Sequence, residues 1–203
     1  MKVRDVDIDP VTRLVGTLVK LPGIGPKGAQ RIAMNLLRSP SSYAEELADS
    51  IRELARHTHF CSMCRNISTS DPCAICADTK RDRSVVCVVE EPADVTSIER
   101  TGSYRGVYHV LHGVLDPMEG VGPGDIRLDE LVERIKTEKI EEVIIATNPD
   151  AEGEATAHHL AKRLKSLKLK ITRIARGVPM GADLQYVDEI TLTEAISGRR
   201  DFG

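Results

Sequence analysis

Two closely spaced cysteine pairs constrain this chain more than any other feature of its sequence. The pairs Cys61-x-x-Cys64 and Cys73-x-x-Cys76 are separated by eight residues. Such pairs can bring four thiolates tetrahedrally around one zinc ion, with Zn–S distances of about 2.3 Å. Because sulfur fills all four positions, no coordination site remains for water, and we expect a structural zinc ion. Residues 59–80 are therefore predicted to be a four-cysteine zinc finger.

Two other interpretations of the cysteine segment stay open. His57 and His59 lie close enough in the sequence to replace one cysteine, and four free thiols are the second alternative. The fifth cysteine, Cys87, lies in an apolar run and is predicted to be a small core residue. Five cysteines, four of them clustered, fit a metal site in a reducing compartment better than a disulfide framework.

Residues 1–58 are predicted to form a helical domain that contains a helix-hairpin-helix. Asp9 followed by Pro10 is typical of a helix start, since aspartate caps a first turn and proline fits its first position. Apolar residues at 3.6-residue spacing continue this helix to the turn at 21–23, and a second amphipathic helix begins at Pro26.

A third helix is predicted to begin at Ser41 or Ser42 and to end at about His57. Its apolar residues recur at helical spacing, which predicts that one face of the helix packs inward. The residues on this predicted inward face are Leu47, Ile51 and Leu54.

The turn between the first two helices is a candidate anion site. Gly23 and Gly25 allow the backbone to approach an oxygen atom closely, and the first amides of the next helix have no partner inside that helix. Lys27 and Arg31 lie four residues apart and are expected to project beside the turn. The predicted ligand is a phosphate of double- or single-stranded DNA, bound without regard to base sequence. The alternative is an ordinary helical hairpin with a solvated basic face.

Charge along the chain favours this interpretation. Residues 10–38 carry five basic and no acidic side chains, whereas residues 83–203 carry 16 basic and 21 acidic ones. The net charge of −3 therefore conceals a basic N-terminal end that suits a polyanion. Aromatic residues are only 3% of the chain, which disfavours base stacking. No apolar run approaches the roughly 18 residues of a membrane span, so we expect a cytoplasmic protein.

Residues 82–177 are predicted to form an α/β domain with a mainly parallel sheet, which makes the whole chain a multidomain α+β protein. Apolar, valine-rich runs predict buried strands, and helical patterns separate them. The expected strands are 84–89, 107–111, 142–147 and 171–175, and the expected helices are 92–100, 128–139 and 154–167. Residues 112–126 form a long glycine-rich loop that is either functional or mobile. Residues 178–203 are left as a C-terminal tail.

Acidic residues follow two of the predicted strands. Glu90 comes directly after the first strand, and Asp150, Glu152 and Glu154 come after the third. Because the carboxyl ends of parallel strands share one edge of a sheet, these carboxylates can converge there. Such a cluster fits either a divalent cation such as Mg²⁺ or a basic partner surface. The alternative is that Glu152 and Glu154 simply favour the first turn of the next helix.

The order of these motifs resembles the RecR family of bacterial recombination mediators along essentially the whole chain. The matching stretches are LPGIGPKGAQRIA, CSMC, CAIC, VCVVEEPADV, IIATNPDAEGEAT and GADLQYVDEITLTEA. The resemblance implies a helix-hairpin-helix, a zinc finger, a Toprim domain and a Walker-B-like tail that contributes to oligomerisation. It also implies a ring-shaped homotetramer or dimer that acts with RecO and RecF in recombinational repair at the nucleoid, loading RecA on gapped DNA.

By matched motif, the resemblance implies that Lys27 and Arg31 contact DNA and that the four cysteines bind zinc. It also implies that Glu90, Glu152 and Glu154 are the Toprim acids. In this family these acids are tied more to partner binding than to catalysis. Gly28 stands where this family is expected to have serine. Asn148 stands where catalytic Toprim enzymes have aspartate, although Asp150 keeps the second carboxylate, which leaves room for weak Mg²⁺ binding.

We expect a DNA-binding adaptor without enzymatic activity. No Gly-x-x-x-x-Gly-Lys-Ser/Thr motif precedes Asp188 and Glu189 of the tail, so the backbone cradle for a nucleotide phosphate is absent from the sequence. The rival hypothesis is a magnesium-dependent nuclease or topoisomerase-like enzyme that uses Glu90, Asp150 and Glu152. A strand-passing enzyme needs a tyrosine nucleophile, and no motif marks any of the four tyrosines for that role.

Overall fold

The computed structural model describes residues 9–201. The chain divides into two compact units, residues 1–58 and residues 59–203. The first unit is helical, and the second carries the cysteine segment, a parallel sheet and the C-terminal tail. Within the described range, no helix is both long enough and apolar enough to cross a membrane.

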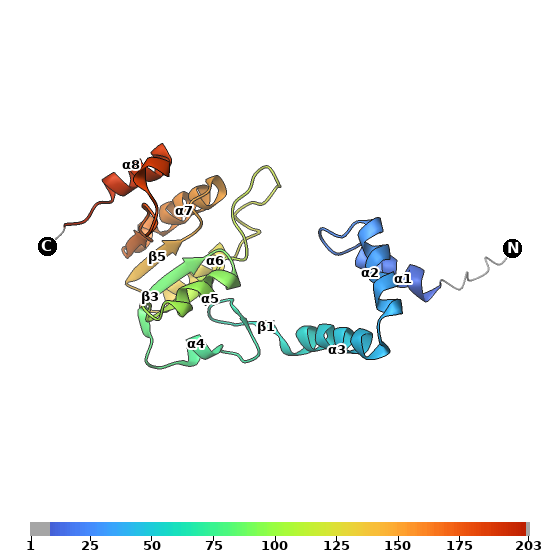
Figure 1. Cartoon of the computed structure of the whole chain (residues 1–203). Helices are drawn as coiled ribbons and strands as arrows, with labels where there is room; N and C mark the ends of the chain where they lie inside the picture. The colour runs from blue at the N-terminus through green and yellow to red at the C-terminus, as the bar shows by residue number, and fades with distance from the viewer. Residues whose placement is uncertain (1–8, 202–203) are drawn as a thin grey trace. The chain divides into compact units, whose positions relative to one another are not determined.

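Three helices make up the described part of the first unit (Figure 1): α1 (Pro10–Leu18), α2 (Pro26–Arg38) and α3 (Ser41–His57). The predicted start of α1 is confirmed, because the Asp9 side chain accepts a hydrogen bond from the Thr12 amide at 3.3 Å. Ala29 and Ala33 of α2 are buried, and their small side chains let α1 and α2 pack closely. The helical hairpin therefore has the form that its sequence predicts.

The prediction that the apolar face of α3 packs inward is wrong for the single chain. Leu47 is 40% exposed, Ile51 is 59% exposed and Leu54 is 63% exposed. An apolar hollow of about 410 Å³ lies between the three helices, lined by residues of all of them. Helical periodicity shows which residues share a face but not what covers that face, and nothing in the described part of this unit covers the later turns of α3.

The second unit is built on four parallel strands in the order β4-β3-β5-β6. These are β3 (Asp82–Val89), β4 (Gly106–Val110), β5 (Glu142–Ala146) and β6 (Lys170–Arg173). Val86 pairs with Val107 on one side and with Val143 on the other, so β3 lies in the centre of the sheet. All four strands lie within about two residues of the predicted ranges, and the parallel α/β prediction is confirmed.

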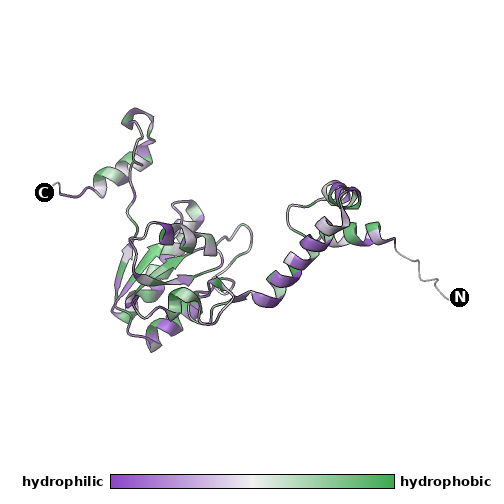
Figure 2. Ribbon diagram, turned by 60° about the horizontal axis from the view of Figure 1, so that its bottom comes forward, coloured by the Kyte–Doolittle hydropathy of each residue, from purple (hydrophilic) through white to green (hydrophobic). Residues whose placement is uncertain are grey.

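Helices cover both faces of this sheet, as a strand run that is apolar at every position predicts. Val86 and Val88 face α6 (Leu128–Thr137) and α7 (Ala151–Leu164), and together they form the larger core. Cys87 and Val89 point to the opposite face, where α5 (Pro92–Arg100) packs. Cys87 is thus the core residue that the sequence predicts. In Figure 2 the strands carry the hydrophobic colour, and the helices that cover them are mixed.

The cysteine segment is attached to the sheet rather than separate from it. It contains a short antiparallel pair, β1 (His59–Phe60) and β2 (Ile67–Ser68), followed by α4 (Ala74–Ala77). The Val110 amide of β4 donates to the Cys64 carbonyl at 2.9 Å, and Ile75 packs against the core on the α5 side. A short 3₁₀ turn (Lys165–Leu167) joins α7 to β6, and β6 is followed by a second 3₁₀ turn (Leu184–Tyr186) and a last helix, α8 (Glu189–Ser197).

Candidate metal centre and nucleic-acid interface

The four paired cysteines come together in one buried cluster. Their sulfur atoms all lie within 4.8 Å of one another, and each residue is at most 4% exposed. The sulfurs of Cys64 and Cys73 are 3.6 Å apart, close to the roughly 3.8 Å edge of a tetrahedron with 2.3 Å Zn–S bonds. His57 and His59 lie outside this cluster. The donor set therefore fits a zinc ion with four sulfur ligands.

Local backbone geometry aims these sulfurs at a common point. Arg65 has a φ of 63°, and its amide donates to the Cys61 carbonyl at 2.9 Å, which closes a tight turn after the first pair. The amides of Cys73 and Cys76 donate to sulfurs of the cluster at 3.3 and 3.5 Å. Hydrogen bonds with the sulfurs of Cys64 and Cys73 raise the pKa of the Cys76 thiol. The four cysteines would hold a dication, whose charge would allow all four thiols to ionise.

The hairpin turn lies at the surface and leaves the start of α2 uncapped. Gly23 has a φ of 76°, a conformation that favours glycine, and Gly25 occupies the N-cap position of α2. Because Gly25 has no side chain, no side-chain cap reaches the first turn, and Pro26 has no amide hydrogen of its own. The amides of Lys27 and Gly28 are therefore available at the positive end of the helix dipole.

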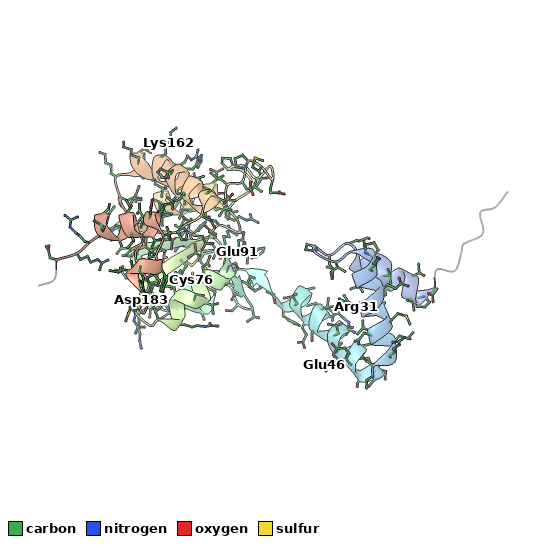
Figure 3. All side chains as sticks on the ribbon, turned by 45° about the horizontal axis from the view of Figure 1, so that its top comes forward. Arg31, Glu46, Cys76, Glu91, Lys162 and Asp183 are labelled. Carbon is green, nitrogen blue, oxygen red and sulfur yellow. The ribbon has the colours of Figure 1, made fainter. Side chains whose placement is uncertain are left out.

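Lys27 and Arg31 are both exposed on α2, and Arg31 is labelled on that helix in Figure 3. Neither side chain forms an ion pair with any residue in the range 9–201, and the first turn of α2 contains no acid. Gly28 faces Ile24, and a Cβ atom placed on it would lie 3.9 Å from the Ile24 Cγ2 atom, which is ordinary contact. The turn, the helix start and both cations thus lie on one accessible surface.

At the carboxyl edge of the sheet, Glu90 is paired with an amide. Its Oε1 atom accepts from the Asn148 backbone amide at 2.7 Å, and its Oε2 atom accepts from the Asn148 side-chain amide at 2.6 Å. Glu90 is 7% exposed, and burial raises its pKa. Strand β3 delivers Glu90 and strand β5 leads to Asn148, so the contact bridges the two central strands.

The other three acids lie in or beside the first turn of α7, which begins three residues earlier than predicted. Asp150 is the N-cap, and its Oδ1 atom accepts from the Gly153 amide at 2.8 Å. Glu154 pairs with Arg173 and Arg176, which the sequence analysis did not single out. The Glu152 carboxylate has no hydrogen bond or ion pair with any of residues 9–201. Outside the cysteines, no three possible metal ligands of this described range cluster within metal-binding distance.

One feature of the sequence could have pointed to Arg173 and Arg176, which is their position relative to the last strand. Arg173 ends β6, and Arg176 follows it three residues later. Strand β6 runs parallel to β5, so its carboxyl end reaches the same edge as Glu154. The tail acids have a local role in the structure: Asp188 caps α8 by accepting from the Thr191 amide at 2.9 Å, and Glu189 lies in the first turn.

Curated relatives match this chain over nearly its whole length. A protein of Myxococcus xanthus is 52% identical over 193 residues, which cover 95% of this chain and 98% of the relative. A protein of Heliobacterium modesticaldum is 53% identical over 193 residues, which cover 95% and 97%. Both are named Recombination protein RecR. The chain belongs to the RecR family.

Four family models match successive parts of this RecR chain. They describe a RecR helix-hairpin-helix (residues 11–55), a RecR zinc finger domain of the four-cysteine type (58–78), a Toprim domain (84–175) and a RecR C-terminal segment (177–200). The predicted fold class and the resemblance are thereby confirmed. The zinc finger model covers the four clustered cysteines, so two independent observations support zinc binding.

Proposed function

We propose that this RecR chain is a DNA-binding recombination mediator that works as a non-enzymatic clamp. In this proposal it acts in the cytoplasm at the nucleoid, with RecO and RecF, to load RecA on gapped DNA. The observation that carries the DNA-binding part is the uncapped start of α2, where backbone amides lie beside two cations that form no ion pair within residues 9–201. The role in recombination follows from the family, and the exposed apolar and acidic surfaces support the clamp and partner assignments.

The helix-hairpin-helix supplies the DNA contact. Amides of the first turn of α2 point out of the helix and donate to a phosphate oxygen, with the helix dipole favouring the negative charge. Lys27 and Arg31 add two positive charges beside that point. None of these groups reads a base edge, so binding is independent of sequence and extends to both double and single strands. Salt weakens it strongly, because each neutralised phosphate releases counterions.

Self-association makes this weak contact useful. One hairpin neutralises only a few phosphates, so several copies on one DNA raise the affinity through effective concentration. Exposed apolar residues support a homotetramer or dimer, because soluble monomers rarely leave large apolar surfaces bare. They occur on the uncovered face of α3 and again on the tail, where Met180, Leu184 and Ile190 are exposed.

The zinc ion has a structural role in this proposal, since four sulfurs leave no open position on the metal. The acidic edge of the sheet serves as a surface for partner proteins. Glu152 has no partner in residues 9–201, whereas Glu90, Asp150 and Glu154 are engaged within the chain. This arrangement supports recognition of a basic surface over metal-dependent cleavage of DNA, which needs free carboxylates around a cation.

A salt series with duplex and single-stranded DNA tests the DNA contact. Lys27→Ala with Arg31→Ala removes two charges per hairpin, so the slope of log K against log salt should become shallower by about 1.8 for each hairpin engaged on duplex. Arg52→Ala with Arg56→Ala is the matched control, because these residues have the same spacing on exposed α3. The proposal fails if the hairpin variant keeps both the wild-type affinity and the wild-type slope.

Sizing in solution tests self-association. Ile51→Asp with Leu54→Asp introduces charge into the uncovered face of α3, and the assembly should fall to a smaller species at equal concentration. A wild-type chain that stays monomeric with and without DNA contradicts the clamp.

A further inference from the structure

Glu90 and Asn148 form a two-point contact at the carboxyl edge of the sheet. Two amide hydrogens of one residue meet the two oxygens of the buried carboxylate, at 2.7 and 2.6 Å. Each Glu90 oxygen therefore has a donor directed at it, and two amide dipoles, rather than a cation, stabilise the carboxylate. Burial raises the pKa of Glu90, as expected for a carboxylate without a cation beside it.

The neighbouring backbone fixes this pairing and closes the space around it. A Cβ atom on Gly153 would lie 2.2 Å from the Asn148 carbonyl oxygen and 2.9 Å from the Glu90 Oε1 atom. Only a residue without a side chain fits there, so α7 starts in direct contact with the pair. The Thr147 hydroxyl also donates to the Gly153 carbonyl at 2.9 Å and holds the first turn of α7 against β5.

The remaining acids of this edge do not complete a cation site. Mg²⁺ takes six oxygen ligands at about 2.0–2.1 Å and usually binds one or two carboxylates directly. Asp150 uses one oxygen to cap α7, and Glu154 is held by Arg173 and Arg176. The two guanidinium groups offset the charge of Glu154, so this carboxylate is not free to coordinate a cation. The residues present therefore do not fit the divalent ion that a Toprim domain implies.

We propose that the side-chain amide of Asn148 takes the place of a divalent cation at this edge, so that the wild-type chain binds no Mg²⁺ or Mn²⁺ there. The side-chain NH₂ group of Asn148 is the group that the proposal depends on. Asn148→Asp replaces this donor with a carboxylate oxygen at hydrogen-bonding distance from Glu90. Position 148 is exposed and Glu90 is buried, so the variant places a second carboxylate beside a partly desolvated one, and such a pair either shares a proton or binds a cation. The variant is therefore converted into a divalent cation site formed by Glu90, the new aspartate and Asp150.

This inference is independent of the DNA contact, because a chain can hold DNA whether or not this edge takes a cation. Its test is direct measurement of Mn²⁺ binding by electron paramagnetic resonance, on full-length protein whose zinc content has been verified. The wild-type chain should show no saturable site at millimolar Mn²⁺. Asn148→Asp should bind one Mn²⁺ per chain, at least about tenfold more tightly than wild type, since a charged oxygen replaces an amide.

Two further variants make the result specific. Asn148→Asp combined with Glu90→Gln should lose the new site, because it removes the partner carboxylate. Gln185→Asp adds the same charge at an exposed position of the same unit and should bind Mn²⁺ no better than wild type. Thermal unfolding gives a second readout, in which Mn²⁺ raises the midpoint of Asn148→Asp and leaves that of wild type unchanged.

Three results overturn the proposal. The first is a saturable Mn²⁺ site in the wild-type chain that Glu90→Gln abolishes. The second is Mn²⁺ binding by Asn148→Asp that is no tighter than that of Gln185→Asp. The third is an Asn148→Asp chain that stays unfolded when Mn²⁺ is present, because a cation then does not substitute for the amide.

Discussion

Two glycines at equivalent helix positions should respond in opposite ways to the same substitution. Gly28 and Gly153 are each the third residue of a helix, α2 and α7. Alanine favours a helix over glycine by about 1 kcal/mol. At Gly28 the added Cβ would meet only the Ile24 side chain, at 3.9 Å. We therefore expect Gly28→Ala to stabilise the helical unit by about 1 kcal/mol, or about 4–8 °C in Tm for a domain of this size.

At Gly153 the same methyl group has no room. Its Cβ would lie 2.2 Å from the Asn148 carbonyl oxygen, so the chain must shift and strain the bonds between Asn148 and Glu90. Overpacking costs about 1–3 kcal/mol, and a lost hydrogen bond to a charged group costs about 1.5–3 kcal/mol. After subtracting the helix gain of about 1 kcal/mol, Gly153→Ala should destabilise the sheet unit by about 1.5–5 kcal/mol.

Hydrogen exchange measured by mass spectrometry suits this pair, because it reports the opening free energy of each unit separately. Gly28→Ala should slow exchange in α1 and α2, and Gly153→Ala should speed exchange in β3 and β5. Gly16 in α1, where an added Cβ meets nothing within 4 Å, is the control and should behave like Gly28. Equal or greater protection of β3 and β5 in Gly153→Ala would refute the reasoning.

Three further predictions concern the sheet unit. Removing zinc with a chelator should speed amide exchange at the end of β4, because the Val110 amide bonds to the Cys64 carbonyl; unchanged protection there would contradict this coupling. Hydrogen bonds from Arg81 lower the pKa of Glu99 in the folded chain. The ionised carboxylate therefore stabilises the fold at pH values above the pKa of an ordinary glutamate, and this stability is lost as the pH falls through the lowered pKa. The wild-type Tm should therefore fall more steeply than that of Glu99→Gln between about pH 5 and pH 3, and parallel curves would count against the pair. Leu160→Ala should lower the free energy of unfolding by about 2–5 kcal/mol in denaturant titrations, because Leu160 is fully buried between α7 and the sheet. A decrease below about 1 kcal/mol would contradict this, because it would mean that neighbouring side chains fill the cavity.

The hairpin, the strands and the cysteine cluster could be predicted because their signals are local. The turn at Gly23 and the proline at position 26 act within a few residues, and the spacing of the cysteines marks the segment in which their sulfurs come together. The valine-rich run before Glu90 likewise marks a strand that is buried on both faces.

Other features depended on contacts between distant residues. The ion pairs of Glu154 with Arg173 and Arg176 join residues 19 and 22 positions apart, and they exist because β6 lies beside β5. Periodicity placed Ile51 on an apolar face of α3 but could not tell whether the same chain covers that face. The predicted start of α7 at residue 154 is three residues late, because Asp150 caps the helix and Ala151 begins it.

The helix starts at the candidate sites differ in what they leave available to a ligand. In α7 the cap carboxylate of Asp150 accepts from the Gly153 amide, and in α5 the Asp94 carboxylate accepts from the amide of the cap residue Glu91, so at both starts a carboxylate satisfies a backbone amide and adds negative charge. In α2 the cap is Gly25, which does neither. In the proposed function, this difference would direct a polyanion to the hairpin and a basic partner surface to the sheet edge, so that the two ligands need not compete for one surface.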